Sequence, residues 1–339
     1  MQRRTTRLAT LAIAILGAIA AWLVATRVFP YHTLNHDEGV YLQQAAMLVD
    51  GQLFLHPPVE DVMRPWFFVD DGDRLYGKYG PTPPAIFALG GVLGTWRLAL
   101  VGVAAAFLAL LAAVVREIAE PPAGVLAAAF ALASPLFLVQ AGTFLPYLPT
   151  ATLNLAFAYG YLRADRNDDR RWAAIAGAAI GLSFLGRPYT ALLFATPFIV
   201  HALWTLHRDW RAALPRQAAT AGLGLAGVVV ALVYNATLTG DPLLFPFYAF
   251  APHDGLGFGT RHIVGQDIPY PPEIALRANA RVLALYLKDW LMGGPLGALL
   301  AAAGLAVVAR RGPSSRTIAV AGPSPPAPPG PLPPRAHPT

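Results

Sequence analysis

The stretch LATLAIAILGAIAAWLVATRVF, residues 8–29, decides the class of this protein. Arg27 is its one charged residue, and a membrane-spanning helix needs about 20 predominantly apolar residues. A secretory signal peptide is the alternative, but its apolar core is shorter, roughly 7–15 residues, and a small-residue cleavage site follows it. Here the bulky sequence TRVFPYH follows at 26–32, so we predict a helix that stays in the membrane.

The composition also indicates an integral membrane protein. The 339 residues are 55% hydrophobic and 13% charged, whereas about a quarter of a typical soluble domain is charged. The formal charge of +6 is not arranged as a basic stripe with interleaved aromatic residues, so no nucleic-acid partner is predicted. Cysteine is absent, which excludes disulfides and thiolate chemistry.

Further apolar stretches predict an all-α polytopic membrane protein with roughly eight transmembrane helices. Helices are expected because open sheet edges cannot satisfy their backbone groups in lipid. The stretches are 8–29, 84–115, 123–140, 149–163, 172–186, 188–206, 218–236 and 281–309. Residues 1–309 thus form the predicted transmembrane domain, and the Pro-rich segment 310–339 is a predicted disordered tail.

The arginines predict how the chain is oriented. If the three arginines before residue 8 are cytoplasmic, alternation places the arginine-bearing loops near 116–122, 164–171 and 207–217 on the same side. This is the positive-inside bias of membrane proteins. Two long loops, about 30–83 and 237–280, then lie on the extracytoplasmic side, where we expect short interfacial helices.

The segment HDEGVYLQQAAMLVDG, residues 36–51, opens the first outer loop with two adjacent carboxylates. An apolar stripe at helical spacing follows Asp37 and Glu38, which predicts a short helix that ends near Gly51 and lies on the membrane face. One interpretation is helix capping by Asn35 or Asp37. The other is catalysis by a carboxylate that the helix start holds in place, and the two are compatible.

Two cations lie near the predicted outer ends of spans. Lys78, in YGKYGPTPP (76–84), either anchors a helix end at the membrane surface or binds an anionic lipid phosphate. Arg187, in FLGRPYTAL (184–192), either marks a helix break before Pro188 or pairs with another group, because a charge within an apolar block is costly.

The second outer loop mixes polar residues with glycines and aromatic residues. His253, Asp254 and Arg261 lie in such a context, which suits a pocket for a polar ligand such as a sugar. The alternative is an irregular loop packed on the membrane face. His36, His253 and His262 are candidate metal ligands, but no close spacing such as HxxxH supports them, so no metal site is assigned.

Together these segments resemble the GT-C superfamily of membrane glycosyltransferases, especially its bacterial protein-mannosyltransferase-like and aminoarabinose-transferase-like branches. The resemblance covers most of residues 8–309 and also includes TGDPLLFPFYAFAPHDGLGFG at 239–259. It implies an enzyme of the bacterial plasma membrane with a cytoplasmic N-terminus and an extracytoplasmic site. The implied donor is a polyprenyl-phosphate sugar, and the implied acceptor is a hydroxyl of a glycan, a glycolipid or a protein.

The resemblance also implies roles for individual residues. Asp37 would be the general base on the acceptor hydroxyl, and Glu38 would orient the acceptor or help to bind it or a metal. Lys78 matches the basic residue near the donor phosphate, and Arg187 is a looser match to that role. A divalent metal is an option rather than a requirement. Fixed cations suit this chemistry, because the departing phosphate gains charge as the sugar becomes oxocarbenium-like.

Two alternatives to a complete enzyme are a transporter or flippase and a non-catalytic family member. A transporter should carry ionisable groups near mid-span, whereas the polar residues here concentrate in the predicted outer loops. Members of the superfamily usually have more spans and a further portion. Because the membrane pattern stops near residue 309, we expect a C-terminally truncated chain.

Overall fold

The computed structural model describes residues 2–56, 65–254, 257–263, 266–291, 294–297 and 299. Helices dominate this part of the chain, which confirms the all-α membrane class. The long helices are α1 (Gln2–Leu23), α4 (Arg97–Ile118), α7 (Tyr147–Asn167), α8 (Arg170–Gly186), α9 (Pro188–Arg208) and α10 (Trp210–Thr239). The shorter ones are η1 (Val24–Val28), α2 (His36–Val49), α3 (Thr82–Val92), α5 (Pro121–Leu132), α6 (Pro135–Ala141), α11 (Pro246–Phe250), α12 (Pro272–Leu285) and η2 (Tyr286–Trp290).

Four helices of the described chain are long and apolar enough to cross a membrane. A bent pair, α5 and α6, meets at 71° and would supply a fifth crossing. The four are Arg4–Val28, Arg97–Ile118, Pro188–Arg208 and Trp210–Thr239. The predicted helices near 149–163 and 172–186 exist as α7 and α8 but do not pass the same test. The count of eight crossings therefore stays a prediction.

The apolar stretch predicted as one unit over 84–115 consists of two helices, α3 and α4. Gly94 lies between them with φ of 106°, a conformation that a helix cannot contain. The turn is tight, because the ring of Trp96 occupies the space that a Cβ on Gly91 would need. A continuous apolar run therefore hides a sharp change of direction.

Two antiparallel hairpins occur in the predicted outer loops, where sequence analysis expects only helices. The first joins β1 (Phe68–Asp70) and β2 (Leu75–Gly77), with Val69 opposite Tyr76. The second joins β3 (Gly259–Ile263) and β4 (Gln266–Tyr270). The short helices expected in these loops are also present as α2 and α11.

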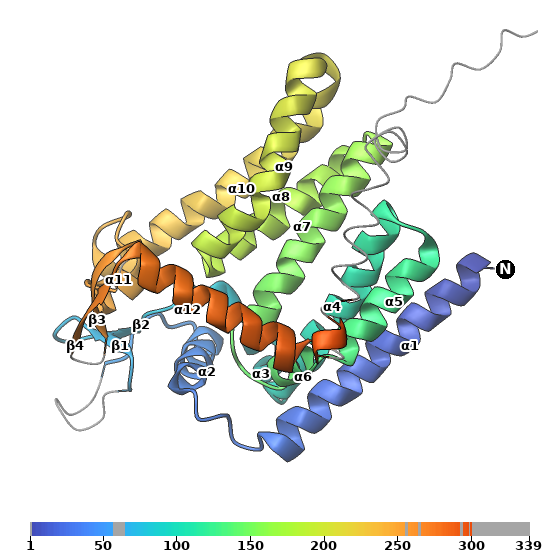
Figure 1. The fold of residues 1–339 in the computed structure, drawn as a ribbon. Helices are drawn as coiled ribbons and strands as arrows, with labels where there is room; N and C mark the ends of the chain where they lie inside the picture. The colour runs from blue at the N-terminus through green and yellow to red at the C-terminus, as the bar shows by residue number, and fades with distance from the viewer. Residues whose placement is uncertain are drawn as a thin grey trace, which may run out of the picture.

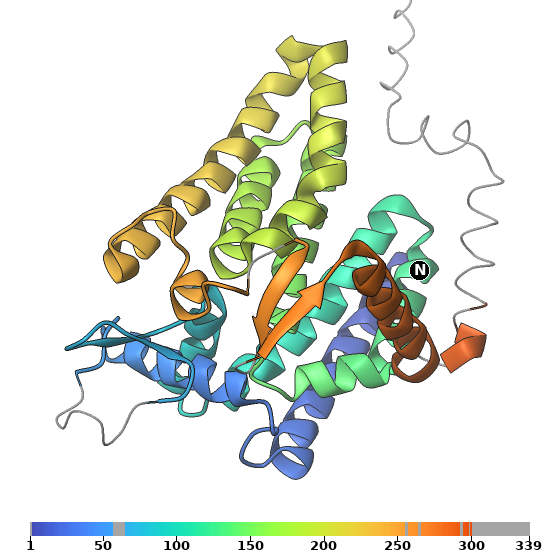
Figure 2. The same cartoon turned by 60° about the vertical axis from the view of Figure 1, so that its left-hand side comes forward.

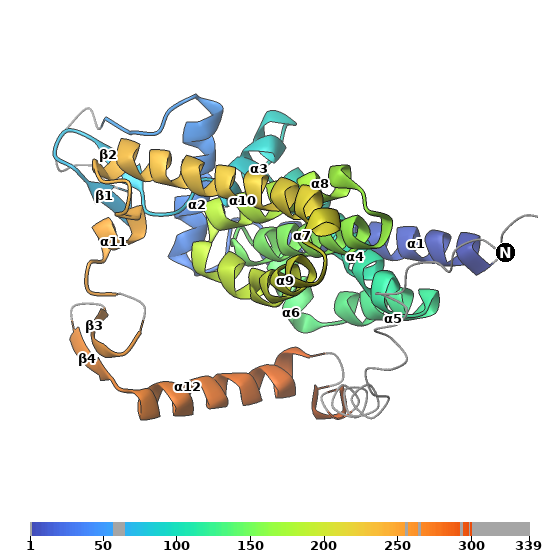
Figure 3. The ribbon, with the colours of Figure 1, turned by 90° about the horizontal axis from the view of Figure 1, so that it is seen from above.

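The bundle has two distinct ends (Figure 1). The N-terminus lies at one end with the turns that join α4 to α5, α7 to α8, and α9 to α10. The opposite end carries α2, the β1–β2 hairpin, α3 and α11. The β3–β4 hairpin and α12 lie to one side of the helical body (Figures 2 and 3).

Small residues let the central helices approach closely. The backbone of α10 at Gly227 packs on Gly181 of α8, and Gly177 of α8 faces the carbonyl of Thr220. Close packing of this kind is a usual way for helices to associate in a membrane. The predicted tail, residues 310–339, and the end of the last predicted crossing lie outside the described residues.

Candidate active site

The site begins at the first turn of α2. Asn35 is the N-cap, since its side-chain oxygen accepts a hydrogen bond of 3.0 Å from the backbone N–H of Asp37. Of the two predicted capping residues, Asn35 thus does the capping. The carboxylate of Asp37 is left for other partners, at the helix end that favours negative charge.

Asp37 and Lys78 form an ion pair between α2 and the segment after β2. The Nζ atom of Lys78 lies 3.4 Å from Oδ1 of Asp37. The side chain of Lys78 is 7% exposed, whereas that of Asp37 is 33% exposed and open to a ligand. The hydroxyl of Tyr79 also hydrogen-bonds Asp37, and burial together with this bond raises the pKa of Tyr79. The two residues predicted to act together are therefore in contact.

Four aromatic rings surround the ammonium of Lys78. Its Nζ lies 3.9 Å from the ring centre of Phe67, 4.8 Å from Phe250, 4.9 Å from Tyr79 and 5.8 Å from Phe247. Burial lowers the pKa of Lys78, and the negative charge of nearby Asp37 acts in the opposite direction. Because Phe67 belongs to the first outer loop and Phe250 to the second, both loops meet at this cation.

Glycines bring the separate sequence motifs together. The carbonyl of Leu185, at the end of α8, occupies the place of a Cβ on Gly80, so the YGKYG segment lies backbone to backbone against α8. On the other side, the side chain of Gln44 of α2 fills the place of a Cβ on Gly77. Lys78 is thus fixed between α2 and the α8 end that leads to Arg187.

Arg187 lies at the junction of α8 and α9. Its guanidinium carbon is 4.7 Å from the ring centre of Tyr147, a typical cation–π contact. Burial raises the pKa of Tyr41, and the positive charge of Arg187 opposes that shift, so the two lie within electrostatic reach. Tyr41 stacks on Tyr79 at 4.4 Å. Arg187 thus contacts Tyr147 and lies within electrostatic reach of Tyr41, which stacks on the neighbour of Lys78.

Glu38 points the other way, into the protein. It is fully buried, and Oε2 accepts a hydrogen bond of 2.8 Å from the backbone N–H of Phe144. Oε1 accepts from the hydroxyl of Thr33 and, at 3.0 Å, from the N–H of Thr33. Glu38 thus ties the start of α2 to the connection between α6 and α7.

The predicted residues of the second loop form a neighbouring group. Asp254 lies 3.6 Å from the guanidinium of Arg261, which also packs 4.3 Å from the ring centre of Tyr270. The charge of Asp254 reaches Lys78 and favours its protonated form. His253 is exposed in the turn after α11, and the side chain of His262 lies outside the described residues.

The residues of this site do not fit a divalent cation. Within the described chain, no group of three or more His, Asp or Glu side chains is arranged to hold a metal. Asp37 already faces an ammonium and a hydroxyl donor, and both oxygens of Glu38 accept hydrogen bonds from protein donors. We therefore derive no step through a metal ion.

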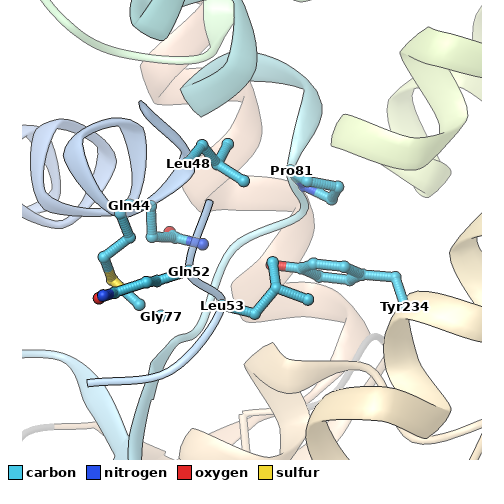
Figure 4. Close-up of a pocket in the computed structure, with 8 residues that line it drawn as sticks. Gln44, Leu48, Gln52, Leu53, Gly77, Pro81 and Tyr234 are labelled. Atoms are coloured by element: carbon cyan, nitrogen blue, oxygen red, sulfur yellow. The ribbon is translucent and has the colours of Figure 1, made fainter. Parts of the chain in front are cut away.

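A small cavity lies behind the Lys78 segment, between α2 and α10 (Figure 4). Its empty volume of about 240 Å³ includes open space, and the enclosed part has room for roughly one water molecule. Gln44 and Tyr234 both donate to the carbonyl of Tyr79, at 3.0 and 3.3 Å. In the described structure Oε1 of Gln44 is buried without a partner. The cavity is large enough for a water molecule beside Gln44 and the carbonyl of Tyr79, but it is too small for a sugar.

The aromatic residues were not predicted from the sequence. Tyr79 lies inside the quoted YGKYGPTPP segment, so its closeness to Lys78 was a usable signal. Phe67 and Phe250 are separated from Lys78 in sequence, and only the folded loops bring them to it.

Comparison with known proteins identifies likenesses to a protein family and to solved structures. A family model described as dolichyl-phosphate-mannose-protein mannosyltransferase matches residues 84–234, a range that includes Arg187 but neither Asp37 nor Lys78. The apo crystal structure of the Archaeoglobus fulgidus oligosaccharyltransferase shares the fold, with a TM-score of 0.51 and 14% sequence identity. That likeness covers 71% of this chain and 32% of the oligosaccharyltransferase, so this chain matches about a third of its length. No curated protein matches the sequence.

Proposed function

We propose that this chain is a membrane glycosyltransferase of the GT-C superfamily, which transfers a sugar from a polyprenyl-phosphate donor to an acceptor hydroxyl; the family model over residues 84–234 and the shared fold support this proposal. The observation that carries the proposal is the contact between Asp37 and Lys78, 3.4 Å apart. It joins a partly exposed carboxylate to a buried cation at one end of a membrane helix bundle. A lipid-borne phosphate and a hydroxyl acceptor need these two kinds of group.

Asp37 is the general base. A base must come within about 3 Å of the hydroxyl that it deprotonates, and the carboxylate of Asp37 is partly exposed for this contact. When the donor phosphate binds, the ammonium of Lys78 leaves Asp37 and contacts the phosphate. It then stabilises the negative charge that develops on the leaving group. The acceptor oxygen attacks the sugar carbon, the bond to the phosphate breaks, and the proton passes to Asp37.

This arrangement favours a single displacement with inversion. A retaining reaction needs a second carboxylate as nucleophile. Glu38 is the neighbouring candidate, but it is fully buried and its oxygens are engaged by Thr33 and Phe144. We assign Glu38 to holding α2 in place. Arg187 serves as a second cation near the phosphate, and His253, Asp254 and Arg261 contact the substrate from the second loop.

The distribution of arginines supports an extracytoplasmic site. Arginine is concentrated in the turns at the end of the bundle opposite the site, together with the N-terminus. Positive residues preferentially remain in the cytoplasm. Asp37 and Lys78 then face the outer side, where the acceptor is a glycan, a glycolipid or a protein. We place the protein in the bacterial plasma membrane.

Replacing Asp37 tests the proposal. In membranes supplied with radiolabelled polyprenyl-phosphate sugars, Asp37→Asn should reduce transfer by roughly 10²–10⁴-fold, the usual contribution of general base catalysis. Asp50→Asn is the matched control, because Asp50 is exposed at the other end of the same helix. Wild-type transfer by a correctly inserted Asp37→Asn protein would refute the assignment of Asp37.

A further inference from the structure

Phe67 has a backbone conformation that its side chain does not favour. Its φ is 62°, in the left-handed region that bulky residues rarely adopt. Asp168 is the other non-glycine residue of the described chain with positive φ, and it ends α7, where Asp tolerates this conformation. Phe67 is the third residue of a turn that is closed by a hydrogen bond of 3.4 Å from the N–H of Phe68 to the carbonyl of Pro65, a position where a positive φ normally selects glycine or asparagine. Strain of this kind persists where the surroundings require it, often at functional sites.

The surroundings of Phe67 lie in the site. Its ring is the nearest of the four aromatic rings to Lys78, with 3.9 Å between the ring centre and Nζ. The same ring packs edge-on against Phe250 of α11, with 5.6 Å between ring centres, and lies 6.2 Å from His36 of α2. One strained residue therefore contacts the cation, the helix that carries Asp37, and the second outer loop.

We propose that Phe67 is a positioning residue, whose ring holds the ammonium of Lys78 beside Asp37 and ready for the donor phosphate. The inference rests on the proposed function of this site. A ring face attracts an ammonium, but more weakly than an anion does. The ring of Phe67 therefore orients Lys78 without competing strongly with the donor phosphate. A carboxylate at the same place would compete with the phosphate for the ammonium. The left-handed backbone turns the ring of Phe67 toward Lys78 and against Phe250.

Kinetics of two variants separate the ring from its bulk. Phe67→Leu keeps an apolar side chain but loses the ring, so the KM for the donor should rise roughly tenfold. Phe67→Tyr keeps the ring and should retain the donor KM within about twofold. The KM for the acceptor should change in neither variant. A folded Phe67→Leu protein with the wild-type donor KM would overturn the inference. Phe67→Met replaces Phe67→Leu if the latter does not fold.

Chemical labelling tests the same inference without any transfer reaction. The chain contains two lysines, Lys78 and Lys288, and Lys288 is exposed in η2. An amine-reactive reagent, followed by mass spectrometry, gives the labelling rate of Lys78 relative to Lys288. Phe67→Leu should raise this ratio at least about threefold, because Lys78 loses the ring that covers its ammonium. Phe67→Tyr keeps the ring and should not raise the ratio. An unchanged ratio in Phe67→Leu overturns the inference. If the labelling ratio rises in Phe67→Leu but the wild-type protein transfers no sugar, only the proposed function is refuted.

Discussion

Asp37 and Glu38 are neighbours in sequence with opposite environments. Consecutive residues of a helix point about 100° apart, so one carboxylate reaches Lys78 while the other enters the protein. The sequence predicts a role for the pair but cannot say which of them is buried. That depends on Phe144, whose N–H donates to Glu38 from 106 residues away.

Glu38 should therefore matter for stability. In Glu38→Gln one carboxylate oxygen becomes an NH₂ group that faces an N–H or O–H donor, which should destabilise the protein by about 1–3 kcal/mol. Thermal unfolding in detergent measures this loss. Glu120→Gln is the control, because Glu120 is exposed, and it should change stability by less than about 0.5 kcal/mol. Equal unfolding temperatures for Glu38→Gln and wild type would show that these hydrogen bonds contribute little.

Donor binding should weaken at alkaline pH, because Lys78 loses its proton there. Burial lowers the pKa of Lys78, while Asp37 and Asp254 oppose that shift. Only the protonated lysine attracts a phosphate, so the donor KM should rise as pH passes the lowered pKa, earlier than for an exposed lysine. Lys78→Arg stays charged at every accessible pH and should abolish this rise. If the donor KM rises equally with pH in the wild type and in Lys78→Arg, another group causes the rise.

At the scale of elements, the sequence predicts helices that have long periodic apolar patterns. The helix after Asp37 was expected to end near Gly51, and α2 ends at Val49, followed by Gly51 with φ of 68°. The hairpins were missed because their strands have three or five residues and depend on contacts across loops. The family resemblance gave Asp37 and Lys78 roles in one site, but it did not predict their contact, and no local pattern links residues 41 positions apart.

The junction of the YGKYG segment with α8 should tolerate no side chain. A Cβ on Gly80 would overlap the carbonyl of Leu185, and a backbone group cannot move aside as a side chain can. Gly80→Ala should therefore destabilise the protein by about 1–3 kcal/mol and reduce transfer by displacing Lys78. Gly102→Ala is the control, because a Cβ there meets nothing within 4 Å, and it should be neutral or stabilising. Comparable unfolding temperatures for the two variants would contradict this account of the junction.

At the scale of the whole molecule, the two ends of the bundle have different chemistry. One end carries the N-terminus and arginine-bearing turns, where Glu117 pairs with Arg166 at 2.7 Å and Asp165 pairs with Arg216 at 2.8 Å. The other end carries Lys78, surrounded by four aromatic rings, and the partly exposed carboxylate of Asp37. The exposed apolar side chains of α1, α9 and α10 lie between these ends and suit contact with lipid acyl chains. The proposed transfer site and the arginine-bearing turns thus lie at opposite ends of the same helices.

This separation predicts which residues an impermeant reagent reaches. The chain has no cysteine, so one introduced cysteine is the sole thiol. Leu34 is 98% exposed just before α2, and Leu34→Cys should react with a charged maleimide in intact cells. Asn167 is exposed at the end of α7, and Asn167→Cys should react only after the membrane is permeabilised. The reason is the positive-inside bias, which retains the arginine-bearing turns in the cytoplasm. The reverse pattern would place Asp37 on the cytoplasmic face, so that both the donor and the acceptor would have to be sought there.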